Sequence, residues 1–171
     1  MQKEIIETER LVLRKFKEDD VLLMFTNWAS DPEVTKYLTW DAHPNIEMTR
    51  MIMNRWMKDY ANEDGMRYCI TIKGSDEPLG SIDVVNVENG VPEVGYCMAK
   101  KCWGKGIMTE ACKAFVQALF ENGYTKVCIC AFVDNIASNR VIQKVGGKFI
   151  KEFKTTVKNK EVLCNYYLIE K

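Results

Sequence analysis

The sequence predicts a single mixed α/β (α+β) domain spanning residues 1–171, with a mostly antiparallel central sheet flanked by helices. Three observations predict this fold class. Stretches that alternate polar and apolar residues, as strands do, are interspersed with stretches that repeat apolar residues at helical spacing. The expected order is β-α-α-β-β-β-α-β-α-β-β, and its three consecutive strands indicate an antiparallel meander. No linker, repeat or low-complexity segment divides the 171 residues, which suffice to bury one core.

The first third of the chain predicts one strand and two helices. Residues 10–16 (RLVLRKF) alternate charged and apolar side chains, as a half-buried strand does. Asp19 and Asp20 then offer an N-cap to an apolar helix that extends to about Trp28. A second helix is expected over 45–60, where apolar residues gather on one stripe. Additional methionines widen this stripe, which suggests that one face is covered by something besides the core.

The middle of the chain predicts the meander. Strands are expected over 66–73, 79–87 and 91–98, and the turn-rich sequence GSDEP separates the first two. Asn89-Gly90 separates the second from the third. This pair is typical of a type I′ hairpin, because both central residues of that turn need positive φ.

The last third predicts two helices and three strands after a loop rich in lysine and glycine. We expect a helix over about 106–122, a short apolar strand over 126–133 and a helix over 136–145. Gly146-Gly147 suits a left-handed C-terminal cap on that second helix. Two closing strands flank Asn159-Lys160, the expected hairpin turn.

The composition excludes several classes of protein. Lys and Arg together number 24, as do Asp and Glu, so no net charge draws the chain toward nucleic acid or an anionic membrane. Charges interrupt the apolar stretches well before the roughly 18 residues of a membrane span. The N-terminal sequence MQKEIIETER lacks the apolar core of a secretory signal. We therefore expect neither nucleic acid nor a membrane as a partner.

Cysteine usage indicates a reducing compartment. The seven cysteines are odd in number and form no CxxC pair. Most fall within apolar strand or helix patterns, where a free thiol behaves as a small hydrophobe. With a single histidine, His43, a Cys/His zinc site has few ligands to draw on. We expect a reduced, cytoplasmic protein without a bound metal.

Residues 101–110 (KCWGKGIMTE) predict a phosphate-binding loop that opens a helix. Gly104 and Gly106 let the backbone turn sharply and let N–H groups approach a ligand without obstruction by a Cβ atom. The free N–H groups and the dipole of a helix N-terminus attract anions. Nearby lysines add positive charge, and the Thr109 hydroxyl is a further donor to a phosphate oxygen. The alternative is a plain turn with a glycine-rich cap, because a bare GxG pattern is common.

Two better-known phosphate loops do not match. A Walker loop requires GxxxxGK followed by Ser or Thr, a pattern that the chain lacks. A dinucleotide fingerprint requires GxGxxG, but Thr109 occupies the position of its third glycine, and too little chain follows for further βα units. Several antiparallel strands followed by one crossover helix are also the wrong order for a Rossmann domain.

Two runs together carry a resemblance to a known family. EVGYCMAKKCWGKGIMTEA, followed by NIASNRVIQKVGG, resembles the GCN5-related N-acetyltransferases (GNAT), and more narrowly their ribosomal-protein (RimJ/RimL-like) branch. The resemblance begins with ETERLVLRKFKEDD and extends over nearly the whole chain. It implies a GNAT-like fold that binds acetyl-CoA with the pyrophosphate on the loop. It also implies direct transfer of the acetyl group to an amine, without an acyl-enzyme intermediate.

The resemblance assigns cofactor-binding residues position by position. Gly104 and Gly106 match the two loop glycines, whereas Lys101 stands where the family usually has Gln or Arg. Asn135 matches the family's pantetheine-binding asparagine, and Ser138 matches a serine close to the cofactor sulfur. The residues thus assigned to acetyl-CoA are Met98, Lys101, Trp103, Gly104, Lys105, Gly106, Ile107, Met108, Thr109, Asn135 and Ser138.

Acetyl transfer to an amine needs a neutral nucleophile, a stabilised oxyanion and a proton for the departing thiolate. By resemblance, Glu93 is the candidate base, acting directly or through water. The backbone N–H near Met98 is a candidate oxyanion donor, on a strand that is expected to splay away from its neighbour. Ile142 occupies a position where many family members carry a catalytic tyrosine, so the proton donor is expected to be Ser138 or a water.

Each of these residues also has a purely structural interpretation. Glu93 is equally well explained as a solvated carboxylate on a strand. Ser138 sits where a helix-capping hydroxyl would lie, and Asn135 is also a good N-cap or Asx-turn residue.

The region before the meander is a candidate acceptor site. His43 has a pKa suited to base chemistry, although a lone loop histidine is more often a surface residue. Trp28, Tyr37, Trp40 and the methionine-rich helix over 46–60 lie where relatives cap the cofactor cleft. Core packing is the alternative explanation for most of them.

The sequence as a whole predicts an acetyl-CoA-dependent N-acetyltransferase that acts on a primary amine, either a protein N-terminal α-amine or a small molecule. One alternative is a catalytically weak domain that binds or senses acyl-CoA, since the family tyrosine is absent and Lys101 departs from the motif. A second is a nucleotide-binding protein that does not use CoA. Specificity resides in variable loops, so the acceptor is not readable from the sequence, nor is the choice between monomer and homodimer.

Overall fold

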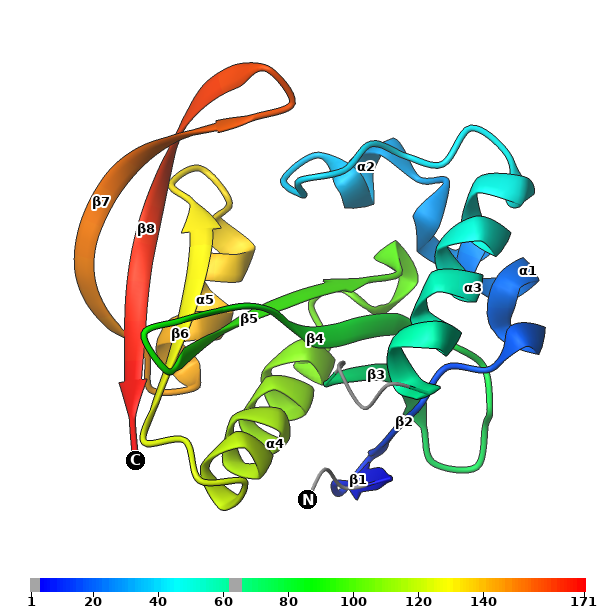
Figure 1. Ribbon diagram of the computed structural model, residues 1–171, viewed down its shortest axis with the longest axis horizontal. Helices are drawn as coiled ribbons and strands as arrows, with labels where there is room; N and C mark the ends of the chain where they lie inside the picture. The colour runs from blue at the N-terminus through cyan, green and yellow to red at the C-terminus, as the bar shows by residue number, and fades with distance from the viewer. Residues whose placement is uncertain (1–3, 62–65) are drawn as a thin grey trace.

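The structure is a computed structural model that describes residues 4–61 and 66–171, and within them the chain forms one eight-stranded sheet (Figure 1). The strand order is β1-β2-β3-β4-β5-β6-β8-β7, and every neighbouring pair is antiparallel except β5 and β6. The strands are β1 (Ile5–Glu7), β2 (Leu11–Arg14), β3 (Arg67–Ile72), β4 (Gly80–Glu88), β5 (Val91–Met98), β6 (Lys126–Phe132), β7 (Lys148–Val157) and β8 (Lys160–Glu170). The α-helices are α1 (Val21–Met24), α2 (Pro32–Thr35), α3 (Ile46–Ala61), α4 (Ile107–Glu121) and α5 (Ile136–Lys144). The predicted class, a mostly antiparallel sheet flanked by helices, is confirmed.

Two short elements are absent from the predicted order. β1 has only three residues, and α2 has four, beginning with Pro32 after an Asp31 side chain that caps the Glu33 amide. Elements this short carry too little periodicity to be recognised. The first predicted helix is also irregular. It begins as a 3₁₀ turn (Glu18–Asp20), continues as α1 and ends as a π-helical turn (Phe25–Ala29).

The turn predictions depend on local backbone geometry, and two of the three hold. Asn89 and Gly90 have φ values of 51° and 77°, as a type I′ turn requires. Gly146 has a φ of 98° and ends α5, and the Gly147 N–H donates to the Ile142 carbonyl at 2.9 Å. The turn predicted at Asn159-Lys160 is wrong by one residue. Lys158 and Asn159 adopt the positive φ values, and Lys160 already pairs with Val157.

Helices cover both faces of the sheet, and each face has its own core. On one face α4 and α5 pack against apolar residues such as Leu13, Ile70 and Ile82, each of which is fully buried. On the other face α1, the π-helical turn and α3 enclose a smaller core around Trp28 and Met53. In the described part of the chain, no helix has both the length and the apolar character needed to cross a lipid bilayer.

The sheet opens between β5 and β6. β5 pairs with β4 along its whole length, but it pairs with β6 only where Glu93 lies opposite Cys128. β6 continues instead alongside β8. Figure 1 shows β5 and β6 leaving this point in different directions, with α5 beside β6. The last residues of β5 therefore border a gap in the sheet, and the chain leads from this gap directly into α4.

Candidate active site

The lysine- and glycine-rich loop lies at the end of β5, where the sheet opens. Residues 103–106 are exposed, and α4 begins directly after them. Gly104 and Gly106 have φ values of 72° and 73°, a left-handed conformation that L-residues with a Cβ adopt at a cost of about 1–2 kcal/mol. A Cβ atom on Gly104 would meet no heavy atom within 4 Å. The loop thus leaves open space beside the N-terminus of α4, where unpaired amides and the helix dipole favour an anion.

Side chains from the segment that joins β1 and β2 hydrogen-bond this loop and the first turn of α4. The Arg10 guanidinium donates to the Lys105 carbonyl at 3.0 Å and to the Glu110 carboxylate at 2.6 Å. Glu110 also accepts bonds from the Thr8 hydroxyl at 2.6 Å and the Arg10 amide at 2.8 Å. Burial alone would raise the pKa of Glu110, but these bonds outweigh it and hold that pKa below its usual value. Neither Arg10 nor Glu110 was among the predicted site residues.

The predicted loop residues present themselves to a ligand in different ways. Ile107 and Met108 point their side chains into the core, so only their backbone amides can face a phosphate. Lys105 is exposed and Thr109 is half-buried. Lys101 forms an ion pair with Glu77, and this contact lowers the pKa of the Glu77 carboxyl. The charge that Lys101 would contribute is thereby partly neutralised.

Trp103 and Met98 contact each other across the start of the loop. The Trp103 indole N–H donates to the Met98 carbonyl at 2.9 Å, while almost half of the Trp103 side chain remains exposed. Met98 itself is buried at the end of β5. Its carbonyl oxygen therefore already has a hydrogen-bond partner in the Trp103 indole.

Asn135 and Ser138 lie together at the first turn of α5. The Asn135 side-chain oxygen accepts a bond from the Ser138 amide at 3.2 Å, as an N-cap does. This cap is the structural role that the sequence left open for Asn135. The Ser138 hydroxyl points elsewhere and lies 2.9 Å from the hydroxyl of Tyr96 on β5. Tyr96 was not predicted as a site residue, although it alternates with Val94 and Met98, whose side chains face the helices.

Glu93 lies on the opposite face of β5. Its neighbours include Cys130 of β6, whose thiol has a raised pKa because of burial and, next, the negative charge on Glu93. Glu93 and Tyr96 are three residues apart on an extended strand, so their side chains point to opposite faces. Glu93 thus lies where β5 still pairs with β6, at the end of the gap, whereas Ser138 contacts β5 from the face that α5 covers. One face holds a carboxylate and the other a hydroxyl.

Asn139 is a further buried polar residue that fixes α5 in place. Its side-chain amide donates to the Phe132 and Asn135 carbonyls at 2.9 and 2.8 Å. Its oxygen accepts bonds from Asn165 and Tyr167 at 2.9 and 2.7 Å. Because all of these bonding groups are satisfied, Asn139 ties the helix that carries Ser138 to β6 and β8.

The candidate acceptor residues do not gather at one place. Trp28 is fully buried in the smaller core, as the packing alternative predicted. His43 bonds the buried Thr49 hydroxyl at 2.7 Å and lies beside Trp40, and burial lowers its pKa. Tyr37 instead reaches the end of β6, where its ring meets Phe132 edge-on at 5.9 Å. Its hydroxyl donates to the Asp134 carbonyl at 3.4 Å, so Tyr37 lies at the junction between β6 and α5.

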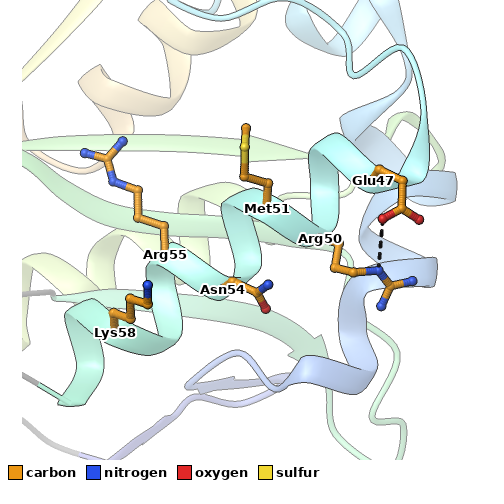
Figure 2. A pocket seen from close by; sticks show the side chains of 6 residues that line it. All are labelled: Glu47, Arg50, Met51, Asn54, Arg55 and Lys58. Carbon is orange, nitrogen blue, oxygen red and sulfur yellow. Dashed lines mark ion pairs between the residues drawn. The ribbon is translucent and has the colours of Figure 1, made fainter.

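Two of the surface hollows that the described residues form lie outside the gap. One, of about 480 Å³, is open to solvent on the outer face of α3 (Figure 2). It is lined by Glu47, Arg50, Met51, Asn54, Arg55 and Lys58, all of which lie on the methionine-rich helix that the sequence offers as part of the candidate acceptor region. The other, of about 360 Å³, adjoins the loop and is lined by residues that include Arg10, Lys73 and Lys105. Among residues 4–61 and 66–171, no three His, Cys, Asp or Glu side chains are arranged to hold a metal ion.

Comparison with known proteins identifies the family of the chain. A family model for the acetyltransferase (GNAT) domain matches residues 10–148. An uncharacterized N-acetyltransferase, p20, from Bacillus licheniformis is 35% identical over 130 residues, which are 72% of this chain and 68% of that protein. The putative ribosomal N-acetyltransferase YdaF of Bacillus subtilis is 32% identical over 122 residues, 70% of this chain and 66% of that protein.

Solved structures show the same fold. A GNAT-family acetyltransferase from Bacillus anthracis superposes with a TM-score of 0.85 at 25% identity, covering 97% of this chain and 98% of its own. RimL, a ribosomal L7/L12 α-N-protein acetyltransferase in complex with coenzyme A, has a TM-score of 0.86 at 22% identity and 98% coverage of both chains. With the family model covering most of the sequence, the chain belongs to the GNAT family and is an N-acetyltransferase.

Proposed function

We propose that this N-acetyltransferase uses acetyl-CoA as the donor and transfers the acetyl group directly to a primary amine. The observation that carries the proposal is the gap between β5 and β6 that leads into the exposed loop at the N-terminus of α4. A long, flexible thiol ester with a charged pyrophosphate suits this arrangement. Its arm can lie along the unpaired edge of β5, and its phosphates can meet the amides of Gly104, Lys105 and Gly106.

Within this proposal Glu93 and Ser138 have different tasks. Glu93 is the base that removes a proton from the acceptor amine, directly or through a water. Ser138 gives a proton to the sulfur as the thiolate leaves. The half-buried positions of both residues leave room for substrate contact.

The acceptor is proposed to be a protein N-terminal α-amine, with a small primary amine as the other possibility. RimL acts on a ribosomal protein α-amine, and YdaF is named as a putative ribosomal N-acetyltransferase. A cytoplasmic location is part of the proposal. The seven cysteines are all free thiols, as is usual in a reducing compartment.

Donor binding is tested at the two loop glycines. Gly104→Val and Gly106→Val would each place a branched side chain in the phosphate cradle and disturb the amides that face it. We expect each to weaken CoA binding at least tenfold by calorimetry, since one hydrogen bond to a charged group is worth about 1.5–3 kcal/mol. Gly90→Val is the matched control for Gly104→Val, because a Cβ on either glycine meets no heavy atom within 4 Å and Gly90 has a similar φ of 77°, but Gly90 lies at another turn. Equal CoA affinity in the loop variants and the control would refute the donor site.

Turnover is tested by release of free CoA thiol from acetyl-CoA. The acceptors offered are peptides with free N-terminal Ser or Ala, the same peptides with blocked N-termini, and small primary amines. We expect release with the free peptides and none with the blocked ones. CoA binding without thiol release from any acceptor would favour the alternative, a domain that senses acyl-CoA. Stabilisation by ATP or NAD but not by CoA would point to a different nucleotide ligand.

A further inference from the structure

The hydroxyl of Tyr96 meets the hydroxyl of Ser138 across the opening of the sheet. The two oxygens are 2.9 Å apart, and the Tyr96 oxygen is 3.5 Å from the Ser138 carbonyl. Tyr96 comes from β5 and Ser138 from the first turn of α5, 42 residues later in the chain. This bond therefore joins the two elements between which the proposed thiol ester would lie.

The direction of this hydrogen bond follows from the chemistry of the two groups. Burial raises the pKa of Tyr96 above its usual value near 10, so the phenol keeps its proton at neutral pH. A phenol is a stronger donor than an aliphatic alcohol, and the Ser138 oxygen is its nearer acceptor. With Tyr96 as donor, the Ser138 proton is free to point at another acceptor. The Ser138 amide is already held by Asn135, so the backbone under this hydroxyl is fixed as well.

The neighbouring position on α5 supplies no such group. Ile142, one turn after Ser138, is fully buried in the larger core, and its side chain packs where a Cβ on Gly147 would lie. In this chain a phenol reaches the same helix from the strand side instead.

We propose that Tyr96 is a positioning residue that orients Ser138 and makes its hydroxyl a better proton donor. This proposal rests on the proposed function. As the new C–N bond forms and the C–S bond breaks, the electron pair leaves on sulfur and the sulfur takes the Ser138 proton. The negative charge that develops on the Ser138 oxygen is stabilised by the bond from Tyr96, and solvent then returns a proton to Ser138.

A double-mutant cycle tests the proposal. The rate of acetyl transfer is measured in a single turnover at saturating acetyl-CoA, with the fastest acceptor among the Ser and Ala peptides and small amines. We expect Tyr96→Phe to slow transfer by about tenfold, the loss expected for one hydrogen bond to a developing charge, with CoA affinity within about twofold of wild type. We expect Ser138→Ala to slow it at least as much. In the Ser138→Ala background, Tyr96→Phe should have no further effect.

The control separates this role from simple destabilisation. Tyr167→Phe removes another tyrosine hydroxyl that bonds α5, at Asn139, but does not touch the Ser138 hydroxyl. It should lower the melting temperature and leave the rate of transfer within about twofold of wild type. An unchanged rate in Tyr96→Phe would overturn the proposal, and so would an equal loss from Tyr96→Phe with and without Ser138. If wild type itself transfers no acetyl group to any acceptor, the proposed function fails and this role fails with it.

Discussion

At the scale of single residues, strand β5 carries two different chemical groups on its two faces. Its odd-numbered positions near the gap include Glu93, and its even-numbered positions include Tyr96. Because successive side chains on a strand point to opposite faces of the sheet, the carboxylate and the phenol are kept apart. In the proposed reaction, proton removal and proton donation therefore occur on opposite faces of the sheet. The carboxylate does not compete with the sulfur for the Ser138 proton.

The role of Glu93 is tested by Glu93→Gln, which keeps the shape of the side chain but cannot accept a proton. We expect turnover at neutral pH to fall by roughly 100-fold, within the usual contribution of a general base, with CoA affinity unchanged. Glu88→Gln is the control, because Glu88 is an exposed carboxylate at the end of the neighbouring strand β4. If Glu93→Gln turns over at the wild-type rate, Glu93 is not the base, and its carboxylate is an ordinary side chain on the strand.

At the scale of elements, the start of α4 is held by side chains from the segment that joins β1 and β2. Glu110 lies in the first turn of the helix, where a negative charge also suits the helix dipole. Arg10 links this carboxylate to the Lys105 carbonyl and so connects the loop to the N-terminal strands. The sequence TERL supplies both the Thr8 and the Arg10 contacts, which gives the N-terminal motif a structural role beside the loop.

The charge on Glu110 makes this contact sensitive to acid. Since the pKa of Glu110 is lower in the folded chain than its usual value of 4.5, the charged form stabilises the fold above that value. This stabilisation is lost as the pH falls through the folded-state pKa. We expect wild type to lose more free energy of unfolding than Glu110→Gln as the pH is lowered from about 5 to about 3, measured by urea unfolding. Parallel losses in the two proteins would show that Glu110 contributes nothing to acid sensitivity.

At the scale of the whole molecule, the C-terminal hairpin reaches back to the N-terminal helical region. Figure 1 shows the β7–β8 hairpin rising on one side of the molecule and α2 on the other, above the strands β4 and β5. At the tip of the hairpin the Lys158 ammonium donates to the Thr35 carbonyl at 2.9 Å and lies 3.2 Å from the Asp41 carboxylate. Together with the contact of Tyr37 on Phe132, this bond joins the segment after α2 to the far half of the sheet.

Removing this connection should loosen the segment that follows α2 without affecting the donor site. We expect Lys158→Ala to speed amide hydrogen exchange over residues 36–45 and to leave CoA affinity within about twofold of wild type. Lys154→Ala is the matched control, because the Lys154 ammonium pairs with Glu161 inside the same hairpin, at 2.8 Å. Unchanged exchange in Lys158→Ala would mean that the segment is held by other contacts.

Much of the fold was predictable from the sequence because local features specify it. Alternation predicted the strands of the meander, and Asn89-Gly90 and Gly146 marked turns whose φ values only certain residues adopt easily. The misplaced turn at Lys158-Asn159 illustrates the limit of such signals. Lysine rarely adopts a positive φ, so the local sequence does not predict that the turn begins at Lys158. The register with β8, which depends on the whole hairpin, decided it.

The candidate site likewise has a part that the sequence determined and a part that only the tertiary structure decided. By itself the sequence determined the glycine loop at the start of α4, the fold class and the family, because each is recognised from short runs of consecutive residues and from their order along the chain. Only the tertiary structure decided that Tyr96 meets Ser138, 42 residues away, and that Arg10 meets Glu110, 100 residues away. It also decided that Ile107 and Met108 turn their side chains into the core. These outcomes depend on which faces of distant elements pack together, and short-range patterns of residues do not contain that information.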